Sequence, residues 1–329
     1  MSRTTLPRTR LAAGIPTKAL RLVQWADVIL VSSSAGKDSL ALLWHVYLLA
    51  KAAGVTDRIL VVHCDLGRVE WGSTRELAEQ QARALGLDFI AVRRNGGDLL
   101  QQVRDRHVRL VAKTATEEEK QGLAAGALPV PPAWFSSAAR YCTSNNKRDV
   151  VGQLMAALQQ EHGDLGRPLR ILNCMGQRAA ESKARAKKLP LVIDKRASTQ
   201  GRTVVTWMPV HHLSDAAVWR MIEASGLPYS AVYDTGMRRL SCVFCMMATF
   251  DDLVLAARQD PELAAEYVAV ERETGSTFKR GLSMADVLAR ALELNATEGP
   301  VRVARGAAMA EHLGWDATRL YLAGLGLAA

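Results

Sequence analysis

Cysteine is scarce in this chain, and no apolar run is long enough to cross a membrane. The five cysteines among 329 residues form an odd and sparse set, which does not suit the disulfide framework of a small secreted protein. No run approaches about 18 apolar residues, so we expect no transmembrane helix and no membrane partner. The N-terminus is basic but no apolar segment follows it, which predicts a flexible basic tail over residues 1–20 and not a secretory signal. We therefore expect a cytoplasmic protein.

Acidic side chains are outnumbered as well. The chain has 33 Asp and Glu residues against 42 Lys and Arg residues, which gives a formal net charge of +9. Such a balance favours polyanionic partners. The densest basic stretch, residues 183–202, is either a solvated surface or a surface that contacts the phosphates of a nucleic acid or of a second nucleotide.

The most informative segment follows the first apolar run of the chain. Residues 28–31 are Val-Ile-Leu-Val, residues 32–39 are Ser-Ser-Ser-Ala-Gly-Lys-Asp-Ser, and an apolar helical stretch covers residues 40–50. A strand, a turn of small polar residues and a helix form the context in which backbone N–H groups and a helix N-terminus bind phosphate. The loop is not a Walker A motif, because Asp38 follows Lys37, and it is not a dinucleotide-binding G-x-G-x-x-G loop.

Each residue type in this loop suits phosphate chemistry. Gly36 allows the backbone to approach phosphates, Lys37 supplies a positive charge, and Ser39 offers a hydroxyl. Asp38 could cap the following helix and orient the loop or a Mg²⁺ ion. An ordinary capped helix start is the alternative. The predicted nucleotide-binding residues are Ser32, Ser33, Ser34, Ala35, Gly36, Lys37, Asp38 and Ser39, with Asp65 and Gly176 at the ends of two later strands.

Strand-like and helical patterns alternate through the first two-thirds of the chain. This alternation predicts an α/β fold with a doubly wound, mostly parallel, five-stranded Rossmann-like sheet, whose ligands bind beyond the carboxyl ends of the strands. Ser73 to Glu76 has the pattern of a capping box, and Ser214 is expected to cap a later helix. The predicted strands are 27–31, 58–64, 88–93, 169–174 and 203–208, and the predicted helices are 38–53, 74–85, 97–112, 145–161, 179–187 and 214–225.

Residues 113–137 interrupt this alternation. Their acidic run, glycines and prolines predict a long mobile insertion, of the kind that forms lids or binding loops. We expect a nucleotide-binding α/β domain over residues 21–226 and an α-rich C-terminal region over residues 227–329. The predicted helices of that region are 250–258, 261–274, 283–294 and 306–313.

Three cysteines stand outside the predicted strands. Cys142 follows the insertion, and Cys242 and Cys245 form a C-x-x-C pair. Such a pair can be a redox dithiol, half of a zinc site or part of a cluster site, and no second pair is present to complete a four-cysteine zinc site. Cys64 and Cys174 lie in predicted strands, where small buried hydrophobic residues are the simpler interpretation.

The loop at residues 34–39 resembles the PP-loop, S-x-G-x-D-S, of the ATP pyrophosphatases that split ATP into AMP and pyrophosphate. Residues 27–250 as a whole resemble the branch of that superfamily that contains phosphoadenylylsulfate (PAPS) reductases and the sulfur-inserting ATP pyrophosphatases of bacterial DNA phosphorothioation. The further matching elements are Cys64-Asp-Leu-Gly67, the block from Arg140-Tyr-Cys-Thr to Lys147-Arg148, and Met175-Gly-x-Arg178-x-x-Glu181-Ser182-x-x-Arg185.

Two departures favour ATP cleavage over sulfonucleotide reduction. No cysteine follows Cys245, whereas PAPS reductases resemble one another in a catalytic cysteine near the C-terminus, and the Lys37-Asp38-Ser39 half of the loop is intact. The resemblance to sulfur-inserting enzymes then implies a [4Fe-4S] cluster on Cys142, Cys242 and Cys245, with one iron open to hold a sulfide. Cys174 is a possible fourth ligand, and a metal-free thiol relay is the alternative.

The function expected from the sequence is adenylation of an acceptor oxygen by ATP and replacement of that oxygen by sulfur, in DNA phosphorothioate modification. The expected cofactors are ATP, Mg²⁺ and the cluster. The expected partners are nucleic acid (DNA before RNA), a sulfur donor such as a cysteine desulfurase, and other modification-system subunits. The alternatives are a thiol-dependent PAPS or adenylylsulfate reductase, a tRNA-thiolating enzyme and a non-catalytic ATP-binding subunit. The predicted catalytic residues are Lys37, Asp38, Ser39 and Arg178, and the predicted phosphate or acceptor contacts are Lys147, Arg148, Glu181, Ser182, Lys183 and Arg185.

Overall fold

A six-stranded sheet forms the centre of the protein, which we describe from a computed structural model over residues 17–136 and 138–301. The strand order is β3-β2-β1-β4-β6-β5, and every neighbouring pair is parallel except β5 with β6. The predicted doubly wound α/β fold is confirmed. The strands are β1 Val28–Ser33, β2 Ile59–Asp65, β3 Asp88–Arg93, β4 Leu169–Cys174, β5 Leu191–Ile193 and β6 Arg202–Trp207.

Both faces of the sheet are covered by helices, which is why its central strands are apolar on both sides. Ile29 and Val31 of β1 pack with residues of α1 and α2, whereas Val28 and Leu30 pack with Met155 of α6 on the opposite face. The helices are α1 Thr17–Trp25, α2 Lys37–Ala53, α3 Thr74–Ala84, α4 Leu99–Gln121, α5 Tyr141–Thr143, α6 Asp149–His162, α7 Lys183–Ala186, α8 Asp215–Ser225, α9 Phe250–Gln259, α10 Pro261–Thr274 and α11 Met284–Glu298.

The prediction of five strands was one too few. The missed strand, β5, has three residues and pairs antiparallel with β6 at the edge of the sheet. Three residues are too short for an alternating pattern to stand out from the surrounding basic stretch. The predicted tail over residues 1–20 also ends too late, because α1 begins at Thr17.

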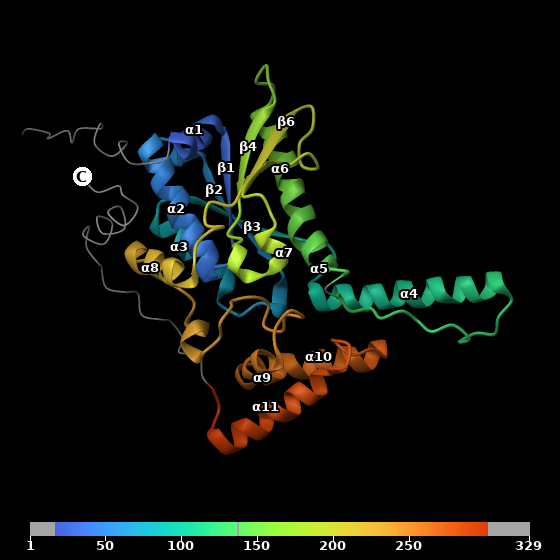
Figure 1. The fold of residues 1–329 in the computed structure, drawn as a ribbon. Helices are drawn as coiled ribbons and strands as arrows, with labels where there is room; N and C mark the ends of the chain where they lie inside the picture. The colour runs from blue at the N-terminus through green and yellow to red at the C-terminus, as the bar shows by residue number, and fades with distance from the viewer. Residues whose placement is uncertain (1–16, 137, 302–329) are drawn as a thin grey trace, which may run out of the picture.

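The insertion was predicted to begin at residue 113, but α4 continues to Gln121. Its N-terminus is capped by Asp98, whose carboxylate accepts the N–H of Gln101 at 3.0 Å, and Gly122 ends it in the left-handed conformation, with φ of 65°. Glutamate and lysine are good helix formers, so the acidic run extends the helix. Figure 1 shows α4 projecting from the sheet, with the following segment running back along it.

The capping predictions had mixed outcomes. Ser214 caps α8 through the N–H of Ala217 at 3.2 Å, as predicted. The capping box at residues 73–76 was wrong, since Ser73 makes no side-chain capping bond within the described part of the chain. Helices α9, α10 and α11 confirm three of the predicted C-terminal helices, and the fourth, 306–313, lies outside the described residues. Across residues 17–136 and 138–301, none of the helices has the length and apolar character needed to span a bilayer.

Acid is expected to destabilise the fold through His45 on α2. Burial lowers the pKa of this histidine to about 4, with the nearby His212 acting in the same direction, against an ordinary value of 6.5. The unfolded chain therefore binds one more proton between these values, so stability falls as the pH is lowered from 6.5 to 4, by up to about 3 kcal/mol. Urea unfolding at a series of pH values measures this slope. His45→Gln should flatten it, whereas His162→Gln, at an exposed position, should not; equal slopes in all three proteins would contradict the assignment.

Candidate nucleotide and sulfur site

Serine hydroxyls of the loop between β1 and α2 form hydrogen bonds with the loop's own backbone. The Ser39 hydroxyl donates to the carbonyl of Gly36 at 2.9 Å and accepts the N–H of Ser34 at 3.2 Å. The Ser33 hydroxyl accepts the N–H of Ala35 at 3.2 Å. Ala35 has a φ of 54°, which is uncommon for a residue with a Cβ and marks a sharp turn of the backbone. The loop therefore leads directly from the end of a buried strand to the N-terminus of a 17-residue helix, as a phosphate-binding loop requires.

Lys37, the first residue of α2, is covered by a distant segment of the chain. Its backbone N–H donates to the Tyr233 hydroxyl at 2.8 Å, and its Nζ donates to the carbonyl of Arg238 at 2.8 Å. The Tyr233 hydroxyl also accepts the N–H of Leu240 at 3.2 Å, and Leu240 packs against Ala35. Sequence reasoning missed Tyr233, because it lies almost 200 residues away and in no motif.

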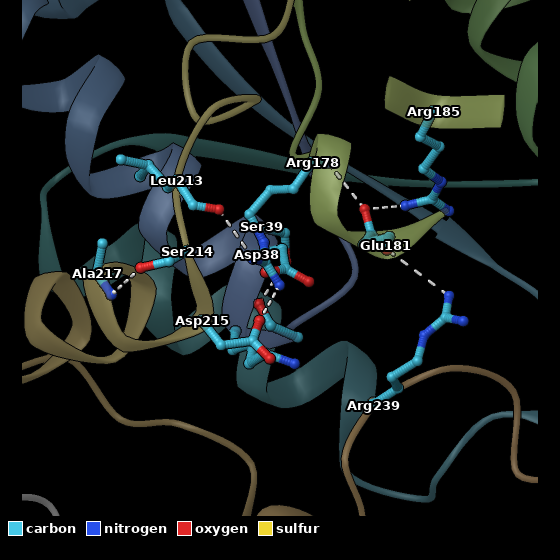
Figure 2. A network of polar contacts seen from close by, with 12 residues as sticks. Asp38, Ser39, Arg178, Glu181, Arg185, Leu213, Ser214, Asp215, Ala217 and Arg239 are labelled. Carbon is cyan, nitrogen blue, oxygen red and sulfur yellow. Dashed lines mark hydrogen bonds and ion pairs between the residues drawn. The ribbon is translucent and has the colours of Figure 1, made fainter. Parts of the chain in front are cut away.

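Asp38 and Arg178 follow strands β1 and β4, and their side chains form an ion pair beyond the carboxyl ends of these strands. Arg178 is 2% exposed, and its Nε donates to Asp38 at 2.6 Å. Its other nitrogens donate to the carbonyl of Leu213 at 3.0 Å and to the carboxylate of Asp215 (Figure 2). Burial raises the pKa of Asp38, and Arg178 opposes that rise. The guanidinium therefore fixes the position of the Asp38 carboxylate and, through it, the start of α2.

This pairing corrects one expectation for Asp38. The N-cap residue of α2 is Gly36, so Asp38 does not cap the helix. Its geometry fits the other predicted role, orientation of the loop. Direct contact of Arg178 with a nucleotide stays a prediction, because the hydrogen bonds described here are made to protein groups.

The strand β4 ends beside the same loop. A Cβ built on Gly176 would lie 2.7 Å from the carbonyl oxygen of Asp38 and 3.1 Å from the backbone nitrogen of Ser39. Gly176 is thus placed beside the phosphate-type loop, and its absent side chain permits the contact, while its role in nucleotide binding stays a prediction. Asp65 ends β2, and its carboxylate accepts the N–H of Gly67 at 2.8 Å.

Residues 181–185 form a small polar network after β4 (Figure 2). Glu181 accepts the N–H of Arg178 at 2.8 Å and forms ion pairs with Arg185 and, at 3.7 Å, with Arg239. Ser182 caps α7 and thereby divides the single predicted helix 179–187 into a 3₁₀ turn and a short α-helix. Glu181, Ser182, Lys183 and Arg185 were predicted to contact phosphate or the acceptor substrate. Within the network of Figure 2, Lys183 is the member of this set without a hydrogen bond or ion pair, and it is exposed.

Two of the three cysteines predicted to act together pack against the same apolar core. Cys142 and Cys242 pack against a core cluster that includes six buried aromatic residues: Trp71, Trp134, Phe135, Phe244, Tyr267 and Phe278. Phe244 lies inside the C-x-x-C pair, and the N–H of Val243 bonds to the carbonyl of Val69 at 2.8 Å. Burial raises the pKa of Cys142, and Cys245 adds to the rise. Burial also raises the pKa of Cys242, to about 12.

Lys147 provides positive charge at these thiols. Burial acts to lower its pKa, but the nearby Cys242, Glu70 and Cys64 outweigh burial, so the net shift is upward and the side chain is a cation. Its neighbour Arg148 forms an ion pair with Asp149 at 3.7 Å instead.

The two strand cysteines differ from each other. Cys174 is fully buried in the core between the sheet and α2, as the simpler interpretation predicted, and it does not lie among the other thiols. Cys64 was wrongly predicted to be a buried strand residue. It is partly exposed, its thiol lies 3.9 Å from the carbonyl of Lys147, and burial raises its pKa to about 11. Its position near the end of the strand, in the Cys64-Asp-Leu-Gly67 element, could have indicated that it is partly exposed.

A buried histidine links the two parts of the site. His63 is 1% exposed and contacts the carbonyl of Ser33 at 3.1 Å through Nδ1 and the carboxylate of Glu70 at 3.1 Å through Nε2. Burial acts to lower the pKa of His63, but Glu70, the Ser33 carbonyl and Asp65 together raise it by more, so the net shift is upward. Neither residue was predicted from the sequence.

The donor set suits some metal sites better than others. Within residues 17–136 and 138–301, no group of three or more His, Cys, Asp or Glu side chains is arranged to hold a single metal ion. An iron–sulfur cluster is wider than one ion and takes thiolates from separate segments, such as those that carry Cys142 and the Cys242–Cys245 pair. Magnesium at a nucleotide needs only one or two carboxylates besides the phosphates, which Asp38 and Asp65 could supply.

A doubly wound parallel sheet with a phosphate-type loop after its first strand defines a nucleotide-binding α/β protein. The chain belongs to the phosphoadenosine phosphosulfate reductase domain family, whose model matches residues 28–248. This is an enzyme family of adenine-nucleotide-dependent sulfur chemistry.

Several solved structures are similar to the chain. They include a PAPS reductase from Candida auris in a phosphate complex, with 15% identity, a TM-score of 0.39, and coverage of 68% of this chain and 87% of that one. A U34-tRNA thiolase, NcsA, from Methanococcus maripaludis with its [4Fe-4S] cluster has 12% identity, a TM-score of 0.34, and coverage of 83% and 78%. A glutamine-dependent NAD⁺ synthetase from Acinetobacter baumannii has 16% identity, a TM-score of 0.32, and coverage of 90% and 46%. No curated protein sequence matched the chain.

Proposed function

We propose that this protein is an ATP pyrophosphatase that adenylates an acceptor oxygen so that sulfur can replace it. The observation that supports this proposal most strongly is the short connection between the loop and the cysteines. Tyr233, Arg238 and Leu240 contact the loop at residues 35–37, and Cys242 follows Leu240 by two residues. A nucleotide on the loop and sulfur on the cysteines would therefore be neighbours.

The loop residues account for the first half of the reaction. The triphosphate would lie on residues 34–39, at the positive end of the α2 helix dipole. The acceptor oxygen would attack the α-phosphorus, forming a new P–O bond, while the bond to the β-phosphate breaks and pyrophosphate leaves. Lys37 would neutralise the charge that develops on the leaving group, and Arg178 would keep Asp38 and the helix start in place.

The cysteines account for the second half. Cys142, Cys242 and Cys245 would hold a [4Fe-4S] cluster, which when bound supplies inorganic sulfur for transfer. Lys147 would hold the negative charge of the sulfur atoms and attract the adenylated acceptor. Attack by sulfur then forms the new bond to the acceptor and expels AMP with the original oxygen.

Nucleic acid is the proposed acceptor, with the DNA backbone as first choice. The net charge of +9 favours a polyanion, and Lys183, Lys187, Lys188 and Lys195 are exposed beside the edge strand β5. A cysteine desulfurase and further modification-system subunits are the proposed partners.

Product analysis under anaerobic conditions tests the proposal. Purified protein with Mg·ATP and DNA should release AMP and pyrophosphate, and mass spectrometry should find sulfur in DNA from cells that contain the protein. Cys242→Ala should abolish sulfur incorporation and iron binding while ATP cleavage persists, and Cys174→Ala, at a thiol outside the site, should retain all three. Release of ADP and phosphate would overturn the first half, sulfite release from PAPS would favour a reductase, and sulfur found in tRNA alone would change the acceptor.

A further inference from the structure

Tyr267 of α10 has a hydroxyl group that the fold itself does not explain. The side chain is 0% exposed, and its ring stacks on Trp134 at 5.6 Å and meets the edges of Phe244 and Phe278 at 5.0 and 5.6 Å. The Tyr267 oxygen has no hydrogen-bond partner among the residues that the structure describes. Phenylalanine would fill the same space without burying an unpaired hydroxyl, which destabilises a folded protein.

The surroundings of this hydroxyl indicate what it could bind. Its ring packs on Phe244, the residue between the two cysteines of the C-x-x-C pair. Cys142 and Cys242 pack against the same core cluster as Tyr267. Burial raises the pKa of Tyr267, and Cys242, Cys245, Asp98 and Cys142 raise it further. The phenol therefore remains protonated and can act as a hydrogen-bond donor toward negatively charged sulfur.

The Tyr267 hydroxyl does not donate a hydrogen bond to any cysteine thiol among the described residues. A fully buried hydroxyl in the core against which Cys142 and Cys242 pack, with no partner of its own, fits a group held by these cysteines. Thiolate and sulfide are anionic, and a hydrogen bond to an anion is stronger than one between neutral groups.

We propose that Tyr267 is a positioning residue whose hydroxyl donates a hydrogen bond to the sulfur atoms held by Cys142, Cys242 and Cys245. This inference rests on the proposed function, since it requires those cysteines to hold a sulfur-containing group. Lys147 supplies positive charge to the same sulfur atoms, and Tyr267 adds a directional contact from the buried side. Such contacts to cluster sulfur atoms are one way in which a protein sets the stability and reduction potential of a cluster.

Tyr267→Phe is expected to have opposite effects on the iron-free protein and on the protein reconstituted with iron and sulfide. In the full chain without iron, the variant should resist urea at least as well as the wild type, with a folding equilibrium constant up to about fivefold higher, because an unpaired hydroxyl is gone. After anaerobic reconstitution with iron and sulfide, the same variant should lose iron to a ferrous chelator about tenfold faster than the wild type, because its sulfur atoms have lost a donor.

Tyr141→Phe is the matched control, because its hydroxyl already donates to the carbonyl of Ala133 at 2.7 Å in the same region. It should destabilise the iron-free protein and leave the rate of iron loss near that of the wild type. Equal rates of iron loss in wild type and Tyr267→Phe, or a less stable iron-free Tyr267→Phe, would overturn the role of Tyr267 alone. A wild-type protein that binds no iron or sulfide would overturn this role together with the proposed cluster.

Discussion

Lys37→Met is expected to lower the rate of pyrophosphate release from Mg·ATP by about 10²–10³-fold, the loss typical for removal of one group that stabilises charge in a transition state. Methionine retains the length and apolar stem of lysine but cannot neutralise the leaving pyrophosphate. The measurement is single-turnover release of labelled pyrophosphate at saturating ATP. Lys37→Arg, which keeps the charge, should retain more activity than Lys37→Met.

Two measurements distinguish this catalytic loss from a folding defect. The Lys37 ammonium donates to the carbonyl of Arg238, so thermal unfolding of the variant must be recorded beside its activity. Lys51→Met alters an exposed lysine near the other end of the same helix and should keep wild-type activity. Pyrophosphate release at the wild-type rate from a folded Lys37→Met protein would exclude the proposed use of the loop.

Gly176→Ala is expected to destabilise the protein by about 1–3 kcal/mol, as overpacking in a filled interior does, and to weaken ATP binding at the same time. The new methyl group would lie 2.7 Å from the carbonyl oxygen and 2.9 Å from the carbonyl carbon of Asp38. Both are backbone atoms, so the strain can be relieved only by moving the start of α2 away from β4. Urea unfolding and ATP titration measure the two effects.

Gly152→Ala in α6 serves as the comparison for that variant. Apart from its chain neighbours and the backbone of its own helix, no heavy atom of the described ranges lies within 4 Å of a Cβ built on Gly152. Alanine should stabilise this position by about 0.5–1 kcal/mol through helix propensity and leave ATP binding unchanged. If the two alanine variants had the same stability and the same ATP affinity, the close approach of Gly176 to the loop would have no role.

Local patterns in the sequence predicted the sheet because each central strand is a nearly continuous apolar run that ends in a polar or glycine-containing turn. The same reasoning found the loop at residues 34–39 and placed Gly176 near it, since the carboxyl ends of parallel strands meet at one edge. It missed β5, which has too few residues to show an alternating pattern. It also missed the acidic end of α4, whose composition is common to helices and loops.

Partners far apart in the chain were beyond the reach of such patterns. The motif containing Arg178 was recognised, but its pairing with Asp38 and Asp215 depends on how three loops meet. Tyr233 and Tyr267 lie in no motif, and only the folded chain places one at the loop and the other at the cysteines. Cys64 was misjudged because a residue near the carboxyl end of a strand can be partly exposed even when the residues before it are buried.

The contact of the Lys37 N–H with Tyr233 means that, if the loop binds phosphate as proposed, the phosphate must replace this acceptor. The Lys37 backbone N–H already has the Tyr233 hydroxyl as its acceptor, and one N–H of the ammonium has the Arg238 carbonyl. Under the proposed function, the apparent dissociation constant for ATP is therefore the intrinsic constant divided by the fraction of molecules in which the Tyr233 hydroxyl has withdrawn. Leu240 and Cys242 belong to the same short segment. Under the proposed function, a sulfur-dependent change that holds this segment in one position would therefore alter ATP affinity, and bound ATP would alter that change by the same factor.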